Sequence, residues 1–358
     1  MVSGGLGPTH DDRTVELLAA AAGLDLVVDA ELEREIESRS RAVAERLKRP
    51  YTDFAGGVTK QATRPSTAVP VGLVGTAPAL VVPIGDRVAV ILPGPPWELK
   101  ELWPRALESA PVRALLARAR RPSRRVLRFY GASESAVARA LAEAGGDGDG
   151  VEATICARDF EIHVDLVVEP GAESRADALA RGLAEPLARY LFAEDEHTVQ
   201  EIVLELCRAH GLTLATAESC TGGLVAARLT SVPGSSDVFL GGVVAYANEV
   251  KVAELGVPEG VLEEHGAVSP ETAAAMAAGV RARLGADVGI ADTGIAGPGG
   301  GTEKKPVGLV YLHVETPDES RGLEFSYPAD RDGIRRRATV AALHLARRLL
   351  SQSRDSHV

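Results

Sequence analysis

The sequence reads Ala215-Thr216-Ala217-Glu218-Ser219-Cys220-Thr221-Gly222-Gly223 where a short apolar run, Leu212 to Ala217, meets a helical pattern, Leu224 to Leu229. A serine at such a strand-to-helix turn can be lifted out of the packed layers and presented to a ligand. The two glycines behind it allow backbone N–H groups to approach a ligand closely, at the positive end of a helix. We therefore expect Ser219 to lie in a ligand site of an α/β domain.

Residues 196–358 alternate helical and strand-like patterns on both sides of this stretch. The expected elements are helix 198–209, strand 212–217, helix 222–230, strand 241–246, helix 270–284, strand 287–293, strand 307–314 and helix 331–350. This order is typical of an α/β/α layered domain with at least a partly parallel sheet.

Residues 1–117 form a second expected region, which begins in a glycine loop and continues as an α/β pattern. Asp11 and Asp12 are expected to cap a helix over 13–22. The further elements expected here are helix 29–47, strand-like runs at 73–74, 80–82 and 88–92, and a short helix through Trp97 and Leu102.

Residues 118–195 predict a small α+β module between these two regions, without an obvious catalytic cluster. An arginine-rich linker over 118–125 is followed by strand 126–130, helix 133–144, a hairpin of strands 151–156 and 160–168, and helix 172–191.

Composition excludes several classes of protein. The 358 residues carry a net charge of −11, which argues against a general nucleic-acid binder, because such a binder has a basic surface. The three cysteines, Cys156, Cys207 and Cys220, show no C-x-x-C spacing, so we expect a reducing cytosol and neither disulfides nor a zinc site. No apolar run reaches membrane-spanning length, and the N-terminus predicts no secretory signal.

Ser219 is a candidate nucleophile, with Lys251 and Tyr246 downstream as its candidate activators. A serine at this position could instead simply cap the helix that follows. Lysine has an ordinary pKa of about 10.4, so Lys251 can act as a base only where burial or a nearby cation lowers that pKa. The alternatives are a solvated Lys251 and a Tyr246 that only packs.

A second glycine-rich loop, Asp292-Thr293-Gly294-Ile295-Ala296-Gly297-Pro298-Gly299-Gly300-Gly301, follows the strand expected over 287–293. Ligands of open α/β sheets bind at the carboxyl ends of strands, and glycines there expose backbone N–H groups to an anion. The alternative is a flexible surface turn. Arg331 and Arg335 share a face at the start of the last helix, which favours an anionic partner.

The N-terminal loop Gly4-Gly5-Leu6-Gly7-Pro8-Thr9 precedes Asp11 and Asp12. These residues could hold a phosphate, or a phosphate bridged by a divalent metal. The alternative is an ordinary loop followed by capping carboxylates.

Six C-terminal motifs, together with the N-terminal loop, make the chain similar to the CinA family (competence/damage-inducible protein A). The motifs are Ala217-Glu-Ser-Cys-Thr-Gly-Gly223, Tyr246-Ala-Asn-Glu-Val-Lys251, His265-Gly-Ala-Val-Ser269, Gly294-Ile-Ala-Gly-Pro298, Lys305-Pro-Val-Gly308 and Arg331-Asp-Gly-Ile-Arg335. Residues 196–358 resemble the PncC-type amidohydrolase domain, which converts nicotinamide mononucleotide to nicotinate mononucleotide and ammonia in pyridine nucleotide recycling.

The resemblance implies that Ser219 is the nucleophile and that Lys251 and Tyr246 activate it, with no metal or cofactor in this domain. We expect the substrate to be bound by Thr221, Gly222, Gly223, Asn248, Gly294, Ala296, Gly297 and Arg335. The small-molecule nucleotide is the expected partner, without nucleic acid or membrane, in a cytoplasmic homo-oligomer.

Residues 1–117 resemble the molybdopterin-binding-like domain, which in this family is linked to a metal-dependent ADP-ribose pyrophosphatase. That resemblance implies a nucleotide or metal site at Gly4, Gly5, Gly7, Thr9, Asp11 and Asp12. The family's strand–helix–strand stretch before this loop is missing, so an incomplete domain is expected, as a degenerate form or through a late start codon. The family's Asn-x-x-Gly-Thr-Ala-Pro-Gly also reads Gly72-Leu-Val-Gly-Thr-Ala-Pro-Ala79 here.

The sequence thus predicts a multidomain α/β enzyme that deamidates nicotinamide mononucleotide. Two alternatives remain: an ADP-ribose pyrophosphatase acting through the N-terminal domain, and a non-enzymatic nucleotide or pterin binder connected with DNA uptake or repair.

Overall fold

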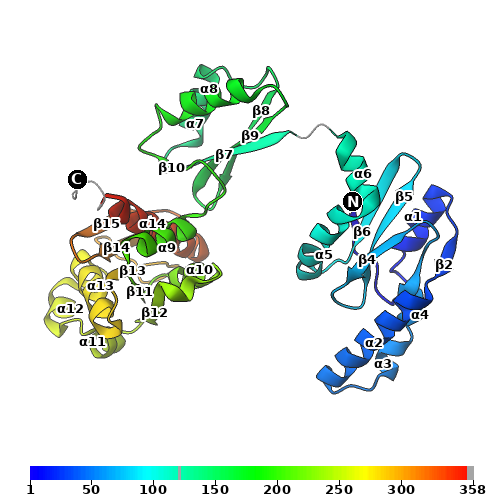
Figure 1. Ribbon diagram of the computed structural model, residues 1–358. Coiled ribbons are helices and arrows are strands. Elements are labelled where there is room, and N and C mark those ends of the chain that lie inside the picture. The colour runs from blue at the N-terminus through cyan, green and yellow to red at the C-terminus, as the bar shows by residue number, and fades with distance from the viewer. Residues whose placement is uncertain (120–121, 353–358) are drawn as a thin grey trace. The chain divides into compact units, whose positions relative to one another are not determined.

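The computed structural model describes residues 1–119 and 122–352 and confirms a multidomain α/β architecture (Figure 1). The chain divides into two compact units, 1–120 and 121–358. Each unit has its own sheets and its own hydrophobic core.

The first unit is built on a four-stranded sheet in the order β1-β6-β5-β4. Its strands are β1 (Val2–Ser3), β4 (Val69–Leu73), β5 (Pro78–Ile84) and β6 (Arg87–Leu92). The helices α5 (Pro96–Glu108) and α6 (Ala110–Arg118) cover one face, and α1 (Thr14–Ala22) covers the other. The smaller elements are β2 (Leu26–Val28), α2 (Ala30–Leu47), α3 (Thr52–Ala55), α4 (Val58–Ala62) and β3 (Thr63–Pro65).

The glycine loop of the first unit leaves the end of β1, which pairs in parallel with β6. A position at the end of a strand agrees with the glycine-rich sequence of this loop, which is typical of a turn. The expected capping by Asp11 and Asp12 is wrong, because α1 begins at Thr14 with Arg13 at its cap position and no side-chain cap. The Asp12 carboxylate instead accepts the Thr9 N–H and hydroxyl, at 3.1 and 2.5 Å.

The second unit begins with an antiparallel sheet in the order β10-β7-β9-β8, covered by two helices. Its elements are β7 (Ser123–Tyr130), α7 (Glu134–Glu143), β8 (Val151–Arg158), β9 (Glu161–Val168), α8 (Glu173–Ala184) and β10 (Leu191–Ala193). Two expected boundaries are wrong. Residues 123–125 belong to β7 because they pair with β9, and α8 ends at Ala184, just before Pro186, which has no N–H for a helical bond. Residues 120–121 of the expected linker lie outside the described residues.

The rest of the second unit is a five-stranded sheet in the order β12-β11-β13-β14-β15. Its strands are β11 (Leu214–Glu218), β12 (Phe239–Val244), β13 (Val288–Gly294), β14 (Leu309–Glu315) and β15 (Ser320–Ser326). The helices α9 (Val199–His210), α10 (Leu224–Thr230) and α14 (Arg331–Gln352) pack on one face, and α11 (Asn248–Leu255), α12 (Glu259–His265) and α13 (Pro270–Leu284) lie on the other side.

Three strands of this sheet are parallel, since β11 lies between β12 and β13 and runs with both (Figure 1). Their carboxyl ends therefore meet at one edge, which is where open α/β sheets bind ligands. The register places Glu218 opposite Val244 on one side and Asp292 on the other. This arrangement brings Ser219, the turn after β12 and the loop after β13 to the same place.

A buried cluster joins the antiparallel module to α14 within the second unit. Glu161 accepts a hydrogen bond from His344 Nε2 at 2.8 Å, and its other oxygen lies 3.1 Å from His163 Nε2. The Tyr130 ring stacks on His344 at 3.8 Å between centroids. Burial opposes ionisation of Glu161, yet the two histidine bonds lower its pKa to about 2, and burial lowers the pKa of His344 to about 4.

We expect this cluster to make the second unit acid-sensitive. The pKa of His344 is about 6.5 in the unfolded chain and about 4 in the folded chain. Its contribution to the free energy of unfolding is therefore complete above pH 6.5 and is lost as the pH falls towards 4. The loss is on the order of 2–3 kcal/mol. Denaturant unfolding at pH 7.5 and 4.5 should show a smaller loss for His344→Gln than for the natural protein. An equal loss in both would contradict this assignment.

Candidate active site

Ser219 directly follows β11 and begins the turn into α10. Its side chain is 8% exposed. Gly222 and Gly223 have φ of 61° and 97°, a left-handed conformation that costs glycine little and other residues more. The alternative in which Ser219 caps the helix is wrong, because Gly223 occupies the cap position of α10 and no side chain caps there.

The Glu218 carboxylate binds the free N–H groups at the start of α10. One oxygen accepts from the Gly223 and Val225 amides at 2.8 and 3.0 Å, and the other accepts from Ala226 at 2.8 Å. A negative charge is stabilised at a helix N-terminus. Glu218 thereby fixes the turn, a role that its position in an apolar strand did not suggest.

Lys251 lies on α11, the helix that follows the neighbouring strand β12, and its side chain reaches Ser219. Its side chain is 1% exposed, and Nζ lies 3.2 Å from Ser219 Oγ. Nζ also donates to the backbone oxygens of Ala245 and Tyr246, at 2.8 and 3.2 Å. Burial lowers the pKa of Lys251. An uncharged amine suits these three neighbours, because its two N–H groups serve the carbonyls and its lone pair can accept the serine proton.

The neighbouring thiol is a poor alternative nucleophile. Cys220 is buried, and this burial raises its pKa to about 12. The thiolate is the reactive form of cysteine, so Cys220 is unreactive near neutral pH. Ser219 is therefore the better candidate at this turn.

Tyr246 lines the site and contacts Arg331 through its hydroxyl. Its side chain is 63% exposed, and its hydroxyl accepts a hydrogen bond from Arg331 Nη2 at 2.9 Å. Arg331 also donates to the Gly297 carbonyl at 2.7 Å. The hydrogen bond from Lys251 goes to the Tyr246 backbone oxygen. A proton relay through the phenol stays a prediction.

A cavity of about 160 Å³ opens beside the serine and the lysine. It is lined by Ser219, Cys220, Tyr246, Lys251, Ala267, Val268, Thr293, Gly294, Ala296 and Arg331. Ala267 and Val268 come from the turn between α12 and α13, which Lys305 holds by donating to the His265 and Val268 carbonyls at 2.7 Å each. The family motif around residue 265 thus supplies part of the cavity wall, a role that the sequence alone did not indicate.

Of the residues expected to bind substrate, two line this cavity and the others are not among its lining residues. Gly294 and Ala296 line it, whereas Asn248 is exposed at the first position of α11. The turn residues Thr221, Gly222 and Gly223 lie behind Ser219, and the Gly297 carbonyl faces Arg331. Arg335 donates to the Cys220 and Thr221 carbonyls at 3.3 and 2.7 Å, so it holds the turn and Arg331 is the arginine at the cavity.

Comparison with known proteins shows the family of this chain. A model described as the CinA C-terminal domain matches residues 196–350, and one described as a probable molybdopterin binding domain matches residues 1–111. A CinA-like protein of Mycolicibacterium paratuberculosis is 42% identical over 369 residues, which cover 99% of this chain and 84% of that protein. The chain belongs to the CinA family.

Two further proteins are similar to this chain. A CinA-like protein of Mycobacterium tuberculosis strain H37Rv is 43% identical over 359 residues, covering 98% of this chain and 83% of its own length. A crystal structure of the competence/damage inducible protein CihA from Agrobacterium tumefaciens is 40% identical and covers 43% of this chain and 96% of its own, with a TM-score of 0.40. No helix among the described residues is both long and apolar enough to cross a membrane.

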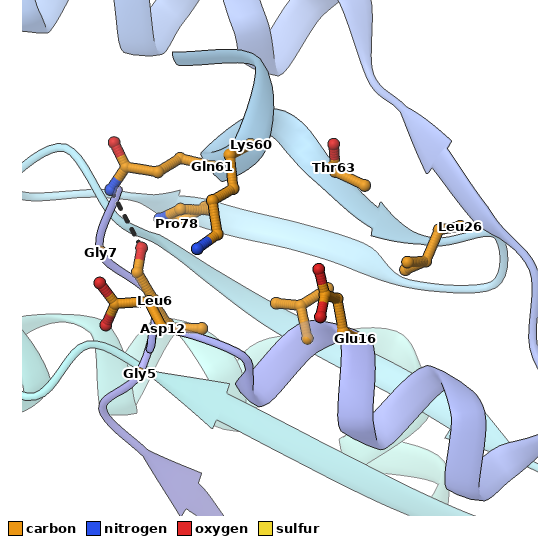
Figure 2. Close-up of a pocket in the computed structure, with 11 residues that line it drawn as sticks. Gly5, Leu6, Gly7, Asp12, Glu16, Leu26, Lys60, Gln61, Thr63 and Pro78 are labelled. Carbon is orange, nitrogen blue, oxygen red and sulfur yellow. Dashed lines mark hydrogen bonds between the residues drawn. The ribbon is translucent and has the colours of Figure 1, made fainter. Parts of the chain in front are cut away.

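The first unit of this CinA protein contains a second cavity, of about 100 Å³, beside the N-terminal glycine loop (Figure 2). Figure 2 shows Asp12, Lys60 and Gln61 towards one end of it and Glu16 towards the other. Gln61 donates to the Leu6 carbonyl at 3.0 Å, and Lys60 donates to the Thr9 carbonyl. The cavity therefore presents two carboxylates and one amine.

The N-terminal residues expected to bind a ligand are divided by the structure. Gly5, Gly7 and Asp12 line the cavity, whereas Gly4, Thr9 and Asp11 are not among its lining residues. The Thr9 hydroxyl bond lowers the pKa of Asp12, so its carboxylate is ionised at neutral pH. Within residues 1–119 and 122–352, no group of three or more His, Cys, Asp or Glu side chains could hold a metal ion. One carboxylate can still bind Mg²⁺ when substrate phosphates supply further ligands.

Proposed function

We propose that this CinA protein is an amidohydrolase that converts nicotinamide mononucleotide to nicotinate mononucleotide and ammonia. The observation that carries the proposal is the 3.2 Å contact between Ser219 Oγ and Lys251 Nζ, two buried groups at one wall of a cavity. A hydroxyl is a weak nucleophile and needs an adjacent base, which a neutral amine provides.

The reaction follows from the chemistry of this pair. Ser219 Oγ attacks the carboxamide carbon while Lys251 takes the hydroxyl proton. Lys251 then gives that proton to the departing nitrogen, so that ammonia leaves and an ester to Ser219 remains. Water, deprotonated by Lys251, hydrolyses the ester and regenerates the hydroxyl. No cofactor takes part in this scheme.

The developing oxyanion needs donors that are not already engaged. The Thr221 and Gly223 amides donate to Asp292 and Glu218, at 2.9 and 2.8 Å, so they are not available for it. Within the described parts of the chain, the Cys220 amide donates to no protein acceptor. The amide directly after a nucleophilic serine is also the usual donor at such turns. We assign the oxyanion to the Cys220 N–H.

The cavity size supports a substrate whose reacting end is small. Its volume of about 160 Å³ lies below the roughly 300 Å³ from which drug-sized pockets start. It suits one aromatic ring with its carboxamide, and the ribose phosphate would then extend outwards past Arg331. The positive charge of Arg331 at the wall suits the phosphate.

Arg331→Gln should raise KM for nicotinamide mononucleotide about tenfold or more, because it removes the charge offered to the phosphate. The effect should shrink for the riboside, which lacks the phosphate. Steady-state ammonia release with both substrates measures this. Arg336→Gln is the matched control, because Arg336 lies on the same helix and pairs with Asp332. An equal loss with both substrates would assign Arg331 a structural role.

A second activity is supported by the N-terminal cavity, which carries the Asp12 carboxylate near Lys60 at one end and the Glu16 carboxylate towards the other. A metal-dependent phosphoesterase acting on ADP-ribose would use the Asp12 carboxylate, together with the substrate phosphates, to bind a divalent ion. Its test is cleavage that chelators abolish, that survives Ser219→Ala and that is lost in Asp12→Ala. Saturable binding without turnover would instead favour a non-enzymatic nucleotide or pterin binder.

A further inference from the structure

Two buried carboxyl groups flank one threonine hydroxyl behind the Ser219 turn. Thr221 Oγ1 lies 2.6 Å from Glu218 Oε2 and 2.5 Å from Asp292 Oδ2. Both carboxyl side chains and Thr221 are buried, with at most 1% of each residue exposed. Both distances lie at the short end of the range for hydrogen bonds between oxygens.

Counting protons shows that one of the two carboxyl groups is protonated. A threonine hydroxyl has one hydrogen, so it can donate to only one of its two oxygen partners. The other short contact needs a hydrogen supplied by the partner, because two acceptors in contact without a proton repel each other. The chain of three groups therefore needs one carboxylic acid.

The partners of Glu218 identify it as the ionised member. Its Oε2 accepts from the Gly223 and Val225 amides, and its Oε1 accepts from Ala226. A proton on either oxygen would compete with a backbone N–H that has a fixed direction. The positive end of α10 also favours the anion.

Asp292 is left as the protonated member. Its Oδ1 accepts the Thr221 N–H at 2.9 Å, the Ser219 N–H makes a weaker contact to the same carboxyl group, and its Oδ2 can carry a proton towards Thr221 Oγ1. Burial, with the charge of Glu218 nearby, raises the pKa of Asp292 to about 7. The charged or titratable groups around it are Glu218 on β11, Cys220 in the turn, Lys251 on α11, and Arg331 and Arg335 at the start of α14.

We propose that Asp292 is a positioning residue that carries a proton in the working protein, forming the chain Asp292–Thr221–Glu218 that fixes the Ser219 turn. The neutral carboxyl has a second consequence. An ionised Asp292 would favour the charged form of Lys251, which cannot take the serine proton. The neutral acid removes that attraction, so it keeps Lys251 available as a base.

Two isosteric substitutions distinguish the members of the chain. In Asp292→Asn the amide oxygen can still accept the Thr221 N–H, and the amide NH₂ can donate to Thr221 Oγ1, as the proposed acid does. In Glu218→Gln the amide NH₂ must face at least one backbone N–H. We expect Asp292→Asn to leave the turn intact, whereas Glu218→Gln lowers the Tm of the full chain at every pH.

The decisive readout is the pH dependence of unfolding, which needs no substrate. The pKa of Asp292 is 3.8 in the unfolded chain and about 7 in the folded chain. The natural protein should therefore lose stability relative to Asp292→Asn as the pH rises between these values. We expect its Tm to fall by roughly 5–10 °C relative to the variant between pH 4.5 and 8. A flat difference, or a natural protein that gains on the variant, would overturn the proposal. So would a Glu218→Gln protein more stable than Asp292→Asn.

A second test measures turnover and rests on the proposed deamidase activity. Asp292→Asn should keep turnover within about threefold of the natural protein, and Asp292→Ala should lose more than about tenfold. Equal losses in both variants would mean that the carboxylate itself is required, which overturns the proposal. If the natural protein releases no ammonia at all, the proposed function fails, and the stability measurement still decides the state of Asp292.

Discussion

Ser219→Ala should lower the rate of ammonia release from nicotinamide mononucleotide by more than about a thousandfold, with the fold unchanged. Removing a nucleophile abolishes the covalent route, and only binding and oxyanion stabilisation remain. The Ser219 hydroxyl is no helix cap, so its loss should cost little stability. Coupled ammonia assays and a melting curve measure both quantities.

Ser231→Ala is the matched control for this substitution. Ser231 is exposed at the end of α10, where its hydroxyl donates to the Arg228 carbonyl at 2.7 Å. This control should leave turnover unchanged. A Ser219→Ala protein with at least a tenth of the natural rate would contradict the nucleophile assignment.

Lys251→Met should reduce turnover by about a thousandfold, because the methionine side chain keeps the volume and removes the base. Burying a lysine that must stay uncharged costs free energy, so the variant should unfold at the same Tm or a higher one. A loss of turnover with retained stability distinguishes a catalytic role from a packing role.

The pH profile gives a second test of Lys251. Burial lowers its pKa, and only the neutral amine acts as a base, so kcat/KM should fall as the pH drops through that lowered value and level off above it. The plateau should be reached well below the ordinary lysine pKa of about 10.4. A rate that keeps rising up to about pH 10 would mean that Lys251 stays charged.

The Ser219–Lys251 pair could be predicted because each residue follows a strand in a recognisable local pattern. A strand, a double glycine and a helix indicate where Ser219 lies, and parallel strands bring their carboxyl ends together. The order of the long helices and buried strands in the C-terminal domain could also be predicted, from the periodicity of their apolar residues. The strand β15 was missed because most of its residues are exposed and it lacks the apolar alternation that identifies a strand.

The chain Asp292–Thr221–Glu218 behind the serine could not be predicted from the spacing of its residues in the sequence. Asp292 and Thr221 are 71 residues apart and meet only because β13 pairs with β11. The different positions of Arg331 and Arg335 could not be predicted either, since residues four apart on a helix share a face but reach different depths. Arg335 contacts the backbone of the turn, and Arg331 lines the cavity.

The most direct test of the deamidase mechanism is the stoichiometry of products formed from nicotinamide mononucleotide by the purified full chain, in the presence of a chelator. We expect one ammonia for each nicotinate mononucleotide, at a rate that the chelator leaves unchanged and that Ser219→Ala abolishes. Product formation no faster than in a protein-free control, or formation that persists in Ser219→Ala, would contradict it.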